Sequence, residues 1–306
     1  MEGGYNQSRL GQIIRMKHPD FIDTNDCSDA QLTDLMNLAL SLKAAARAEY
    51  YPPLLEKRNI CLLLEGANEH LANAYGIALH QFGAFRIEVT PSLAPESLRH
   101  TAETLSSMYD AIILRTERHE TLLTLAKYAD VPIINAGSGY CDPVQEIADL
   151  ITMYEHLPKE KRLEECKVVF DGPESAACRS TLFICSKLGL HFVQLADAAY
   201  HLKPPVLKIA ERNVKRSGGT YGVTESSQEA YRDADFLRTD ARPGQSVPDG
   251  SPYYIDPLAN SVSAIRAVLL LVLYRDPAER DPVLIEKIKR TLSIKLHALF
   301  GYGLKD

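Results

Sequence analysis

The chain has 306 residues, of which 45% are apolar and 24% are charged, and its formal net charge is −6. This length suits two domains of about 100–150 residues each, and the composition is that of a globular protein. The negative charge argues against a nucleic-acid surface, which needs a clustered basic face.

The N-terminus, the apolar runs and the cysteines predict a cytoplasmic protein. Met1–Tyr5 lacks the basic-then-apolar order of a signal peptide. The longest apolar run, Ala267–Tyr274, is far shorter than the roughly 20 residues of a membrane span. The six cysteines include no CxxC pair and have no histidine at ligand spacing, which favours buried free thiols over disulfides or zinc. We therefore expect no membrane association, no metal and no cofactor.

The first half of the chain alternates helices with short apolar strands. Ser28 is expected to cap a helix over 28–48, because apolar residues recur there at helical spacing. Strands are then predicted at 59–64, 85–89, 111–114 and 131–135, and helices at 69–82, 95–108 and 119–129. Strands that alternate with helices of 10–15 residues indicate βαβ units and a parallel sheet.

Gly137–Tyr140 interrupts this alternation, and a long helix predicted over 143–156 leads to a second set of elements. Strands are predicted at 167–170, 191–195, 220–223 and 236–238, and helices at 176–188, 204–217, 227–232, 261–273 and 282–300. The strand at 236–238 is expected to be the last, and 240–257, with four prolines, to be an irregular loop. The predicted fold class is α/β, with two doubly wound parallel-sheet domains: 1–140 together with the C-terminal helix in 282–306, and 141–281.

In open parallel sheets, ligands bind beyond the carboxyl ends of the strands. The site is therefore expected in the loops at 65–69, 90–97, 115–119, 136–142, 171–178 and 238–252. None of these loops contains G-x-G-x-x-G or G-x-x-x-x-G-K-[ST], so a dinucleotide or P-loop nucleotide site has no support.

Four strings, in order and at matching spacing, resemble the aspartate and ornithine carbamoyltransferases. Asp110–Arg115 resembles D-A-I-V-L-R, Val131–Gly137 resembles V-P-V-I-N-A-G, Asp142–Leu150 resembles H-P-T-Q-x-L-x-D-L, and Asn260–Leu270 resembles N-G-x-x-x-R-x-A-L-L. The resemblance covers nearly the whole chain. It implies that family's two-domain fold, a homotrimer with clefts at the subunit interfaces, and a role for Arg115 in holding carbamoyl phosphate.

Other positions that the resemblance assigns to carbamoyl phosphate hold different residues here. The family's S-T-R-T-R matches Asn68–Ala72, so both arginines are missing, and Glu69 would repel a dianion. Ala94 stands at the lysine of K-G-E-T, and Asp142 at the histidine of H-P-x-Q. A carboxylate at that place opposes the stabilisation of a developing oxyanion.

The second half keeps one feature of the family's acceptor site and lacks another. Ala234–Asp240 resembles A-D-V-V-Y-T-D, whose final aspartate contacts the acceptor amino acid, so Asp240 is a candidate for that contact. Only about twenty residues separate Asp240 from Asn260, too few for the family's next helix and strand and its H-P-L-P or H-C-L-P string. The resemblance thus implies that the acceptor lid is missing.

Six residues are candidates for substrate binding, and no residue is assigned a catalytic role: Arg115, Gln145, Asp142, Asp240, Asn68 and His70. For Arg115 the alternative is a salt bridge to Asp142 or Glu65, and for Asp142 it is the N-cap of the following helix. His70 is also compatible with a structural role. Cys178 lies near a helix start, where a thiolate is stabilised, but no histidine near it in sequence supports a nucleophile.

Two functions remain open. The first is a diverged carbamoyltransferase-family protein, a pseudoenzyme candidate, that binds an amino-acid-like ligand and is not a conventional carbamoyl phosphate-dependent enzyme. The alternative is an active transferase that moves a carbamoyl-type group to an amino-acid amine with an altered donor or acceptor. Because the predicted site loops are neutral to acidic, we expect an amine, amide or guanidinium to bind better than a phosphate.

Overall fold

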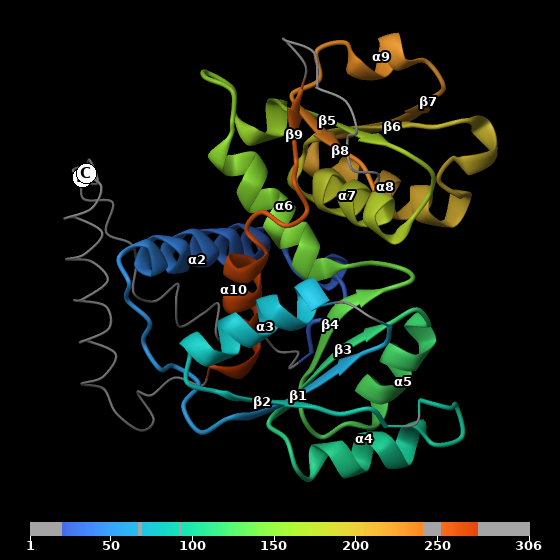
Figure 1. Cartoon of the computed structure of the whole chain (residues 1–306). Helices are drawn as coiled ribbons and strands as arrows, with labels where there is room; N and C mark the ends of the chain where they lie inside the picture. Colours follow the sequence, from blue (N-terminus) through green and yellow to red (C-terminus); the bar gives the residue numbers. More distant parts are fainter. Residues whose placement is uncertain (1–19, 67–68, 92, 241–251, 275–306) are drawn as a thin grey trace.

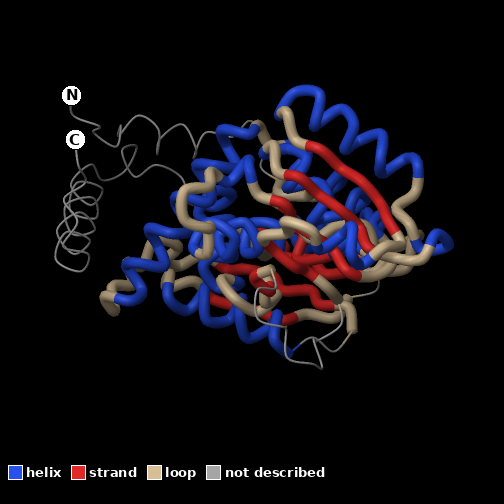
Figure 2. The backbone as a smooth tube through the Cα atoms, turned by 90° about the horizontal axis from the view of Figure 1, so that it is seen from above, coloured by secondary structure: helices blue, strands red, loops and turns tan. Residues whose placement is uncertain are grey.

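The computed structural model describes residues 20–66, 69–91, 93–240 and 252–274, which form two parallel sheets, each flanked by helices (Figure 1). The strands lie inside and the helices outside when the molecule is seen from above (Figure 2). This arrangement confirms the predicted α/β class with two parallel-sheet units.

The first sheet has the order β2-β1-β3-β4 and is formed by β1 (Asn59–Leu64), β2 (Phe85–Glu88), β3 (Ala111–Thr116) and β4 (Ile133–Ser138). Its two inner strands, β1 and β3, are mostly apolar, as expected of parallel strands that are covered on both faces. The connecting helices are α3 (Glu69–Gln81), α4 (Leu98–Ser106) and α5 (His119–Tyr128). Helix α4 begins three residues later than predicted, because 95–97 form a turn.

The second sheet has the order β7-β6-β5-β8-β9 and contains β5 (Lys167–Asp171), β6 (His191–Leu195), β7 (Thr220–Thr224), β8 (Phe236–Arg238) and β9 (Tyr253–Tyr254). Its helices are α7 (Ala176–Leu188), α8 (Pro204–Ser217) and α9 (Ser227–Tyr231). The prediction that β8 is the last strand was wrong. Strand β9 lies in the segment predicted as irregular loop, and it pairs in parallel with β8 through Phe236–Tyr253 and Leu237–Tyr254.

Three helices join the two units: α2 (Asp29–Arg47), α6 (Pro143–Glu155) and α10 (Ser261–Leu273). Ser28 caps α2 in a capping box with Gln31, as predicted. Helix α10 packs against α2, α3 and α6, which explains why its apolar residues are buried although it belongs to neither sheet (Figure 1). Helix α6 runs from the end of β4 towards the second sheet and contacts α7.

The remaining short helices are 3-10 turns at Thr24–Asp26, Leu163–Glu165 and Ala198–Tyr200. All six cysteines are buried and free, as predicted. No helix in the described part of the chain is both long and apolar enough to span a membrane. The helix predicted at 282–300, and its return to the first domain, lie outside the described residues.

Candidate functional site

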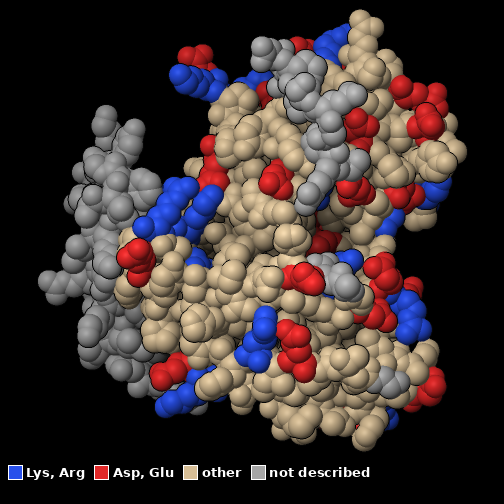
Figure 3. All heavy atoms as spheres, in the orientation of Figure 1, with Lys and Arg blue, Asp and Glu red and all other residues tan. Residues whose placement is uncertain are grey.

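A cleft of about 520 Å³ lies where the carboxyl ends of strands from both sheets face each other. Its walls come from the ends of β3, β4, β5 and β8 and from the first turns of α6 and α7. In Figure 3, acidic and basic side chains gather around the notch between the two halves of the molecule. The cleft thus lies where the parallel-sheet rule places a ligand.

Asp142 has two roles in this cleft. Its Oδ1 accepts a hydrogen bond from Gln145 N at 3.0 Å, so it is the N-cap of α6, and Pro143 follows at the first helical position. It also lines the cleft. Burial raises the pKa of the Asp142 carboxyl, while the hydrogen bond from Gln145 N and the charge of Arg115 oppose that rise.

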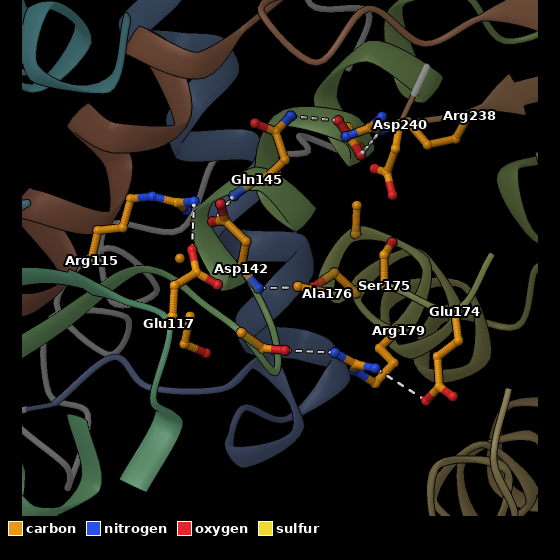
Figure 4. A pocket seen from close by; sticks show the side chains of 16 residues that line it. Arg115, Glu117, Asp142, Gln145, Glu174, Ser175, Ala176, Arg179, Arg238 and Asp240 are labelled. Atoms are coloured by element: carbon orange, nitrogen blue, oxygen red, sulfur yellow. Dashed lines mark hydrogen bonds and ion pairs between the residues drawn. The ribbon is translucent and has the colours of Figure 1, made fainter. Parts of the chain in front are cut away.

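Gln145 and Asp240, two other predicted site residues, also line the cleft. The Gln145 amide donates from Nε2 to Asp149 Oδ1 at 2.7 Å, so part of its hydrogen-bonding capacity is used inside the chain. Asp240 is exposed at the end of the second sheet and points into the cleft (Figure 4). The structure therefore brings Asp142, Gln145 and Asp240 together with Arg115.

Arg115, at the end of β3, forms neither of the salt bridges considered as alternatives. Its Nη2 lies 3.4 Å from Glu117 Oε1, a long contact to a carboxylate whose side chain is 76% exposed. Glu65 instead accepts hydrogen bonds from Thr116 Oγ1 and Glu117 N. The guanidinium lies close to Asp142, since both side chains approach the position that a Cβ atom of residue 137 would occupy.

Gly137 permits this close approach, because its φ is +107° and it carries no side chain. A Cβ atom there would lie 2.7 Å from Arg115 Nη1 and 3.0 Å from Asp142 Oδ2. We expect Gly137→Ala to lower the free energy of unfolding by about 1–3 kcal/mol in urea titrations, through backbone strain and displacement of Arg115. Gly222→Ala is the control, because nothing lies within 4 Å of its Cβ position. Equal unfolding midpoints for the two variants would contradict the expectation.

Arg179, on α7, lines the cleft but is not among the six candidates drawn from the sequence. Its Nε donates to Tyr140 O at 2.8 Å, its Nη2 to Gly139 O at 2.6 Å and its Nη1 to Glu174 Oε1 at 3.1 Å (Figure 4). The guanidinium also lies over the Tyr140 ring. The loop that ends just before Arg179 was among those expected to form the site, but nothing in the sequence marked the arginine itself.

Arg238 and Asp149 form a buried ion pair that lines the cleft. Arg238 Nε lies 3.0 Å from Asp149 Oδ2, and the two side chains are 5% and 6% exposed. Arg238 Nη1 also donates to Thr239 O at 2.6 Å. Burial raises the pKa of the Asp149 carboxyl, and the charge of Arg238 opposes this rise.

Three other residues considered in the sequence analysis do not contribute to the described cleft. His70 is exposed in the first turn of α3 and does not line it. Asn68 lies outside the described residues. Cys178 is fully buried and burial raises the pKa of its thiol, which disfavours a thiolate nucleophile. No group of three or more His, Cys, Asp or Glu in the described segments could hold a metal ion.

Glu146, one residue beyond Gln145, is buried beside the cleft and predicts a pH dependence of stability. Thr24 Oγ1 donates to Glu146 Oε2, whereas Oε1 has no hydrogen-bond partner. Burial raises the pKa of the Glu146 carboxyl well above its usual range, and Asp23 adds to the rise. The folded state therefore favours the protonated form. This contribution is fully present below the ordinary glutamate pKa and is lost as pH rises towards the folded-state pKa.

We expect Glu146→Gln, which cannot ionise, to be more stable than the unmodified chain at pH 7–8 and to lose this advantage towards pH 4. The difference should grow by about 1.4 kcal/mol per pH unit between the two pKa values. Urea unfolding of both proteins across this pH range measures it. A difference that does not change with pH would contradict the expectation.

The relatives of the chain agree with its fold. A family model described as "Aspartate/ornithine carbamoyltransferase, carbamoyl-P binding domain" matches residues 19–155. A putrescine carbamoyltransferase of Mycoplasma capricolum subsp. capricolum is 33% identical over 231 residues, which are 72% of this chain and 63% of that protein. An ornithine carbamoyltransferase of Cutibacterium acnes is 34% identical over 233 residues, 74% of this chain and 69% of that protein. The chain thus spans less than two thirds of the length of the putrescine enzyme.

Solved structures of ornithine carbamoyltransferases share the fold of this chain. The ornithine carbamoyltransferase of Pyrococcus furiosus has a TM-score of 0.74 at 23% identity, covering 83% of this chain and 96% of that one. That of Gloeobacter violaceus has a TM-score of 0.73 at 25% identity, covering 84% and 99%. The matched sequences and the shared fold together show that the chain belongs to the aspartate/ornithine carbamoyltransferase family.

Proposed function

We propose that this chain is a diverged member of the family whose cleft binds an amino-acid-like ligand, meaning a small molecule that presents an amine. We further propose that it is not a conventional carbamoyl phosphate-dependent enzyme. The observation that carries the proposal is the charge of the cleft, where five carboxylates face three arginines. Each arginine lies within 3.4 Å of a carboxylate oxygen of this chain. Such a site favours a cation over a phosphate dianion.

The residues on the donor side support the same proposal. Where the family resemblance places the S-T-R-T-R clamp, this chain has Glu69 and His70, and both are exposed. Ala94 stands at the lysine position, and the half-buried Asp142 at the histidine position. Without clamping arginines or the lysine, a phosphate dianion would depend on Arg115, which already lies beside Glu117 and Asp142.

The second candidate is an active transferase that carbamoylates an amine with an altered donor or acceptor. It is favoured by the similarity to proteins named putrescine carbamoyltransferase, because putrescine is a diamine that an acidic cleft would suit. Arg115, Gln145 and Asp240 would then position the reactants. Both candidates require that an amine binds in the cleft.

Calorimetric titration with phosphate, carbamoyl phosphate, arginine, ornithine, glutamine and the diamine putrescine tests the first candidate. We expect an amine-bearing ligand to bind, and Asp240→Asn to weaken that binding about tenfold or more. Lys215→Ala, at a surface pair with side chains 70% and 49% exposed, is a control that should not change binding. Tight phosphate binding that disappears in Arg115→Ala would overturn the proposal, because it would show a surviving donor site.

The assembly is part of the same proposal. We expect a homotrimer in which residues near Glu65–His70 and Ser92–Glu96 meet across subunits; Asn68 and Ser92 lie outside the described residues. The edge strand β2 supports an interface in this region, since Phe85 is 60% exposed there. Light scattering at micromolar concentration should give three times the chain mass of 34.0 kDa. A monomer would contradict the expectation.

We also propose a division into two domains and a cytoplasmic location. The division into 1–140 with 282–306, and 141–281, is supported by the course of α6, which leaves the first sheet after β4 and reaches α7. A cytoplasmic location is supported by the free thiols, which reducing compartments preserve.

A further inference from the structure

The cleft wall that belongs to the second sheet carries two arginines, and groups of this chain engage both. Arg179 donates from each of its three nitrogens, to Gly139 O, Tyr140 O and Glu174. Its ion pair with Glu174 is sheltered, because each side chain is only 14% exposed. Arg238 is held by Asp149 and by Thr239 O. Among the residues that the structure describes, this wall therefore has no arginine left free to bind an incoming anion.

The same wall carries the exposed carboxylate of Asp240 (Figure 4). Asp240 and the Arg179–Glu174 pair lie around the first turn of α7. Burial raises the pKa of the Cys178 thiol there, and the charges of Asp240, Arg179 and Glu174 also act on it. A ligand ammonium bound at Asp240 thus lies near Arg179, whose three nitrogens already donate hydrogen bonds within this chain.

We propose that the Arg179–Glu174 pair makes the cleft selective for amines without a neighbouring carboxylate, and that it excludes α-amino acids of the same length. This inference rests on the proposed function and narrows its ligand to diamine-like molecules. Glu174 and Arg179 are specificity-determining residues of the site and need not touch any reacting atom.

The physical reason lies in the spacing of charges within an α-amino acid. Its carboxylate is attached to the carbon that carries the α-ammonium, so an α-ammonium bound at Asp240 brings the carboxylate to the same wall. A buried carboxylate without a hydrogen-bond donor loses its hydration, and no contact with the protein offsets that cost. Recruiting Arg179 would break its pair with Glu174 and leave that carboxylate without its partner. Putrescine has no carboxylate, and its second ammonium can reach Asp142 on the opposite wall.

Putrescine and ornithine are matched probes, because they differ by one carboxylate. In calorimetric titrations at neutral pH, the unmodified chain should bind putrescine at least tenfold more tightly than ornithine. Glu174→Gln removes the charge that holds Arg179 and keeps the side-chain shape. It should strengthen ornithine binding about tenfold, which is the size of a charged hydrogen bond, and should not strengthen putrescine binding.

Glu117→Gln is the matched control, since it removes one carboxylate from the opposite wall, beside Arg115. It should leave the ratio of the two affinities within about threefold of the original. If both glutamine variants shift the ratio equally, the selectivity comes from total charge and the inference is wrong.

The unmodified chain tests the inference without relying on any variant. Equal or tighter binding of ornithine overturns the selectivity while leaving the proposed amine site intact. Binding of neither probe overturns the amine site itself, and the inference with it. If the unmodified chain is selective and folded Glu174→Gln keeps the same ratio of putrescine to ornithine affinity, the Arg179–Glu174 pair is not the cause of the selectivity.

Discussion

Purified protein supplied with carbamoyl phosphate and either ornithine or aspartate is expected to form no citrulline or carbamoyl-aspartate at an enzymatic rate. The reason lies on the donor side, because Ala94 and the exposed Glu69 and His70 stand where the family resemblance places a phosphate clamp. Charged donors aimed at a phosphate act in its transition state, and losing one such contact typically costs about 10²–10³ in rate. Losing two arginines and a lysine should therefore leave turnover far below the usual range of roughly 1–1000 per second.

The measurement is colorimetric detection of the ureido product, with a known ornithine carbamoyltransferase as positive control. Putrescine should be included as an acceptor, because the second candidate function predicts product with an amine that lacks a carboxylate. Turnover within the usual range with ornithine or aspartate would contradict the expectation, and turnover with putrescine would favour the second candidate function. Either result would also show that Arg115 holds the donor without the clamp.

Most of the fold follows from the sequence because each strand is short, apolar and followed by a helix of the right length. The predicted strand and helix boundaries mostly fall within one or two residues of those in the structure. Strand β9 could not be predicted, because it has two residues, next to Pro252, and exists only through its pairing with β8. A segment this short carries no periodicity.

The sequence predicted where the site lies, but it predicted only some of the residues that line it. The parallel-sheet rule selected the loops that form the cleft, and the family strings selected Arg115, Asp142, Gln145 and Asp240. The pairs Arg179–Glu174 and Arg238–Asp149 were not found, since the second joins residues 89 positions apart. Such pairs arise from the packing of α6 and α7 against the second sheet.

The Arg238–Asp149 pair carries the second large expected effect, which concerns stability. Replacing Asp149 with alanine should lower the free energy of unfolding by about 3–5 kcal/mol, because it leaves Arg238 buried without its counter-charge. It also removes the acceptor of the Gln145 amide, which then faces the cleft without its partner. Urea unfolding followed by circular dichroism measures the effect.

Two further variants separate the loss of the charge pair from the loss of packing. Glu211→Ala removes the partner of Lys215 at the surface, where the side chains are 49% and 70% exposed, and should change stability by less than about 1 kcal/mol. The double variant Asp149→Leu with Arg238→Met removes both charges and fills most of the space, so it should recover much of the lost stability. If Asp149→Ala were as mild as Glu211→Ala, the pair would not be desolvated in solution. If the double variant were the least stable of all, the loss would come from packing around α6 and β8, and the ion-pair explanation would be wrong.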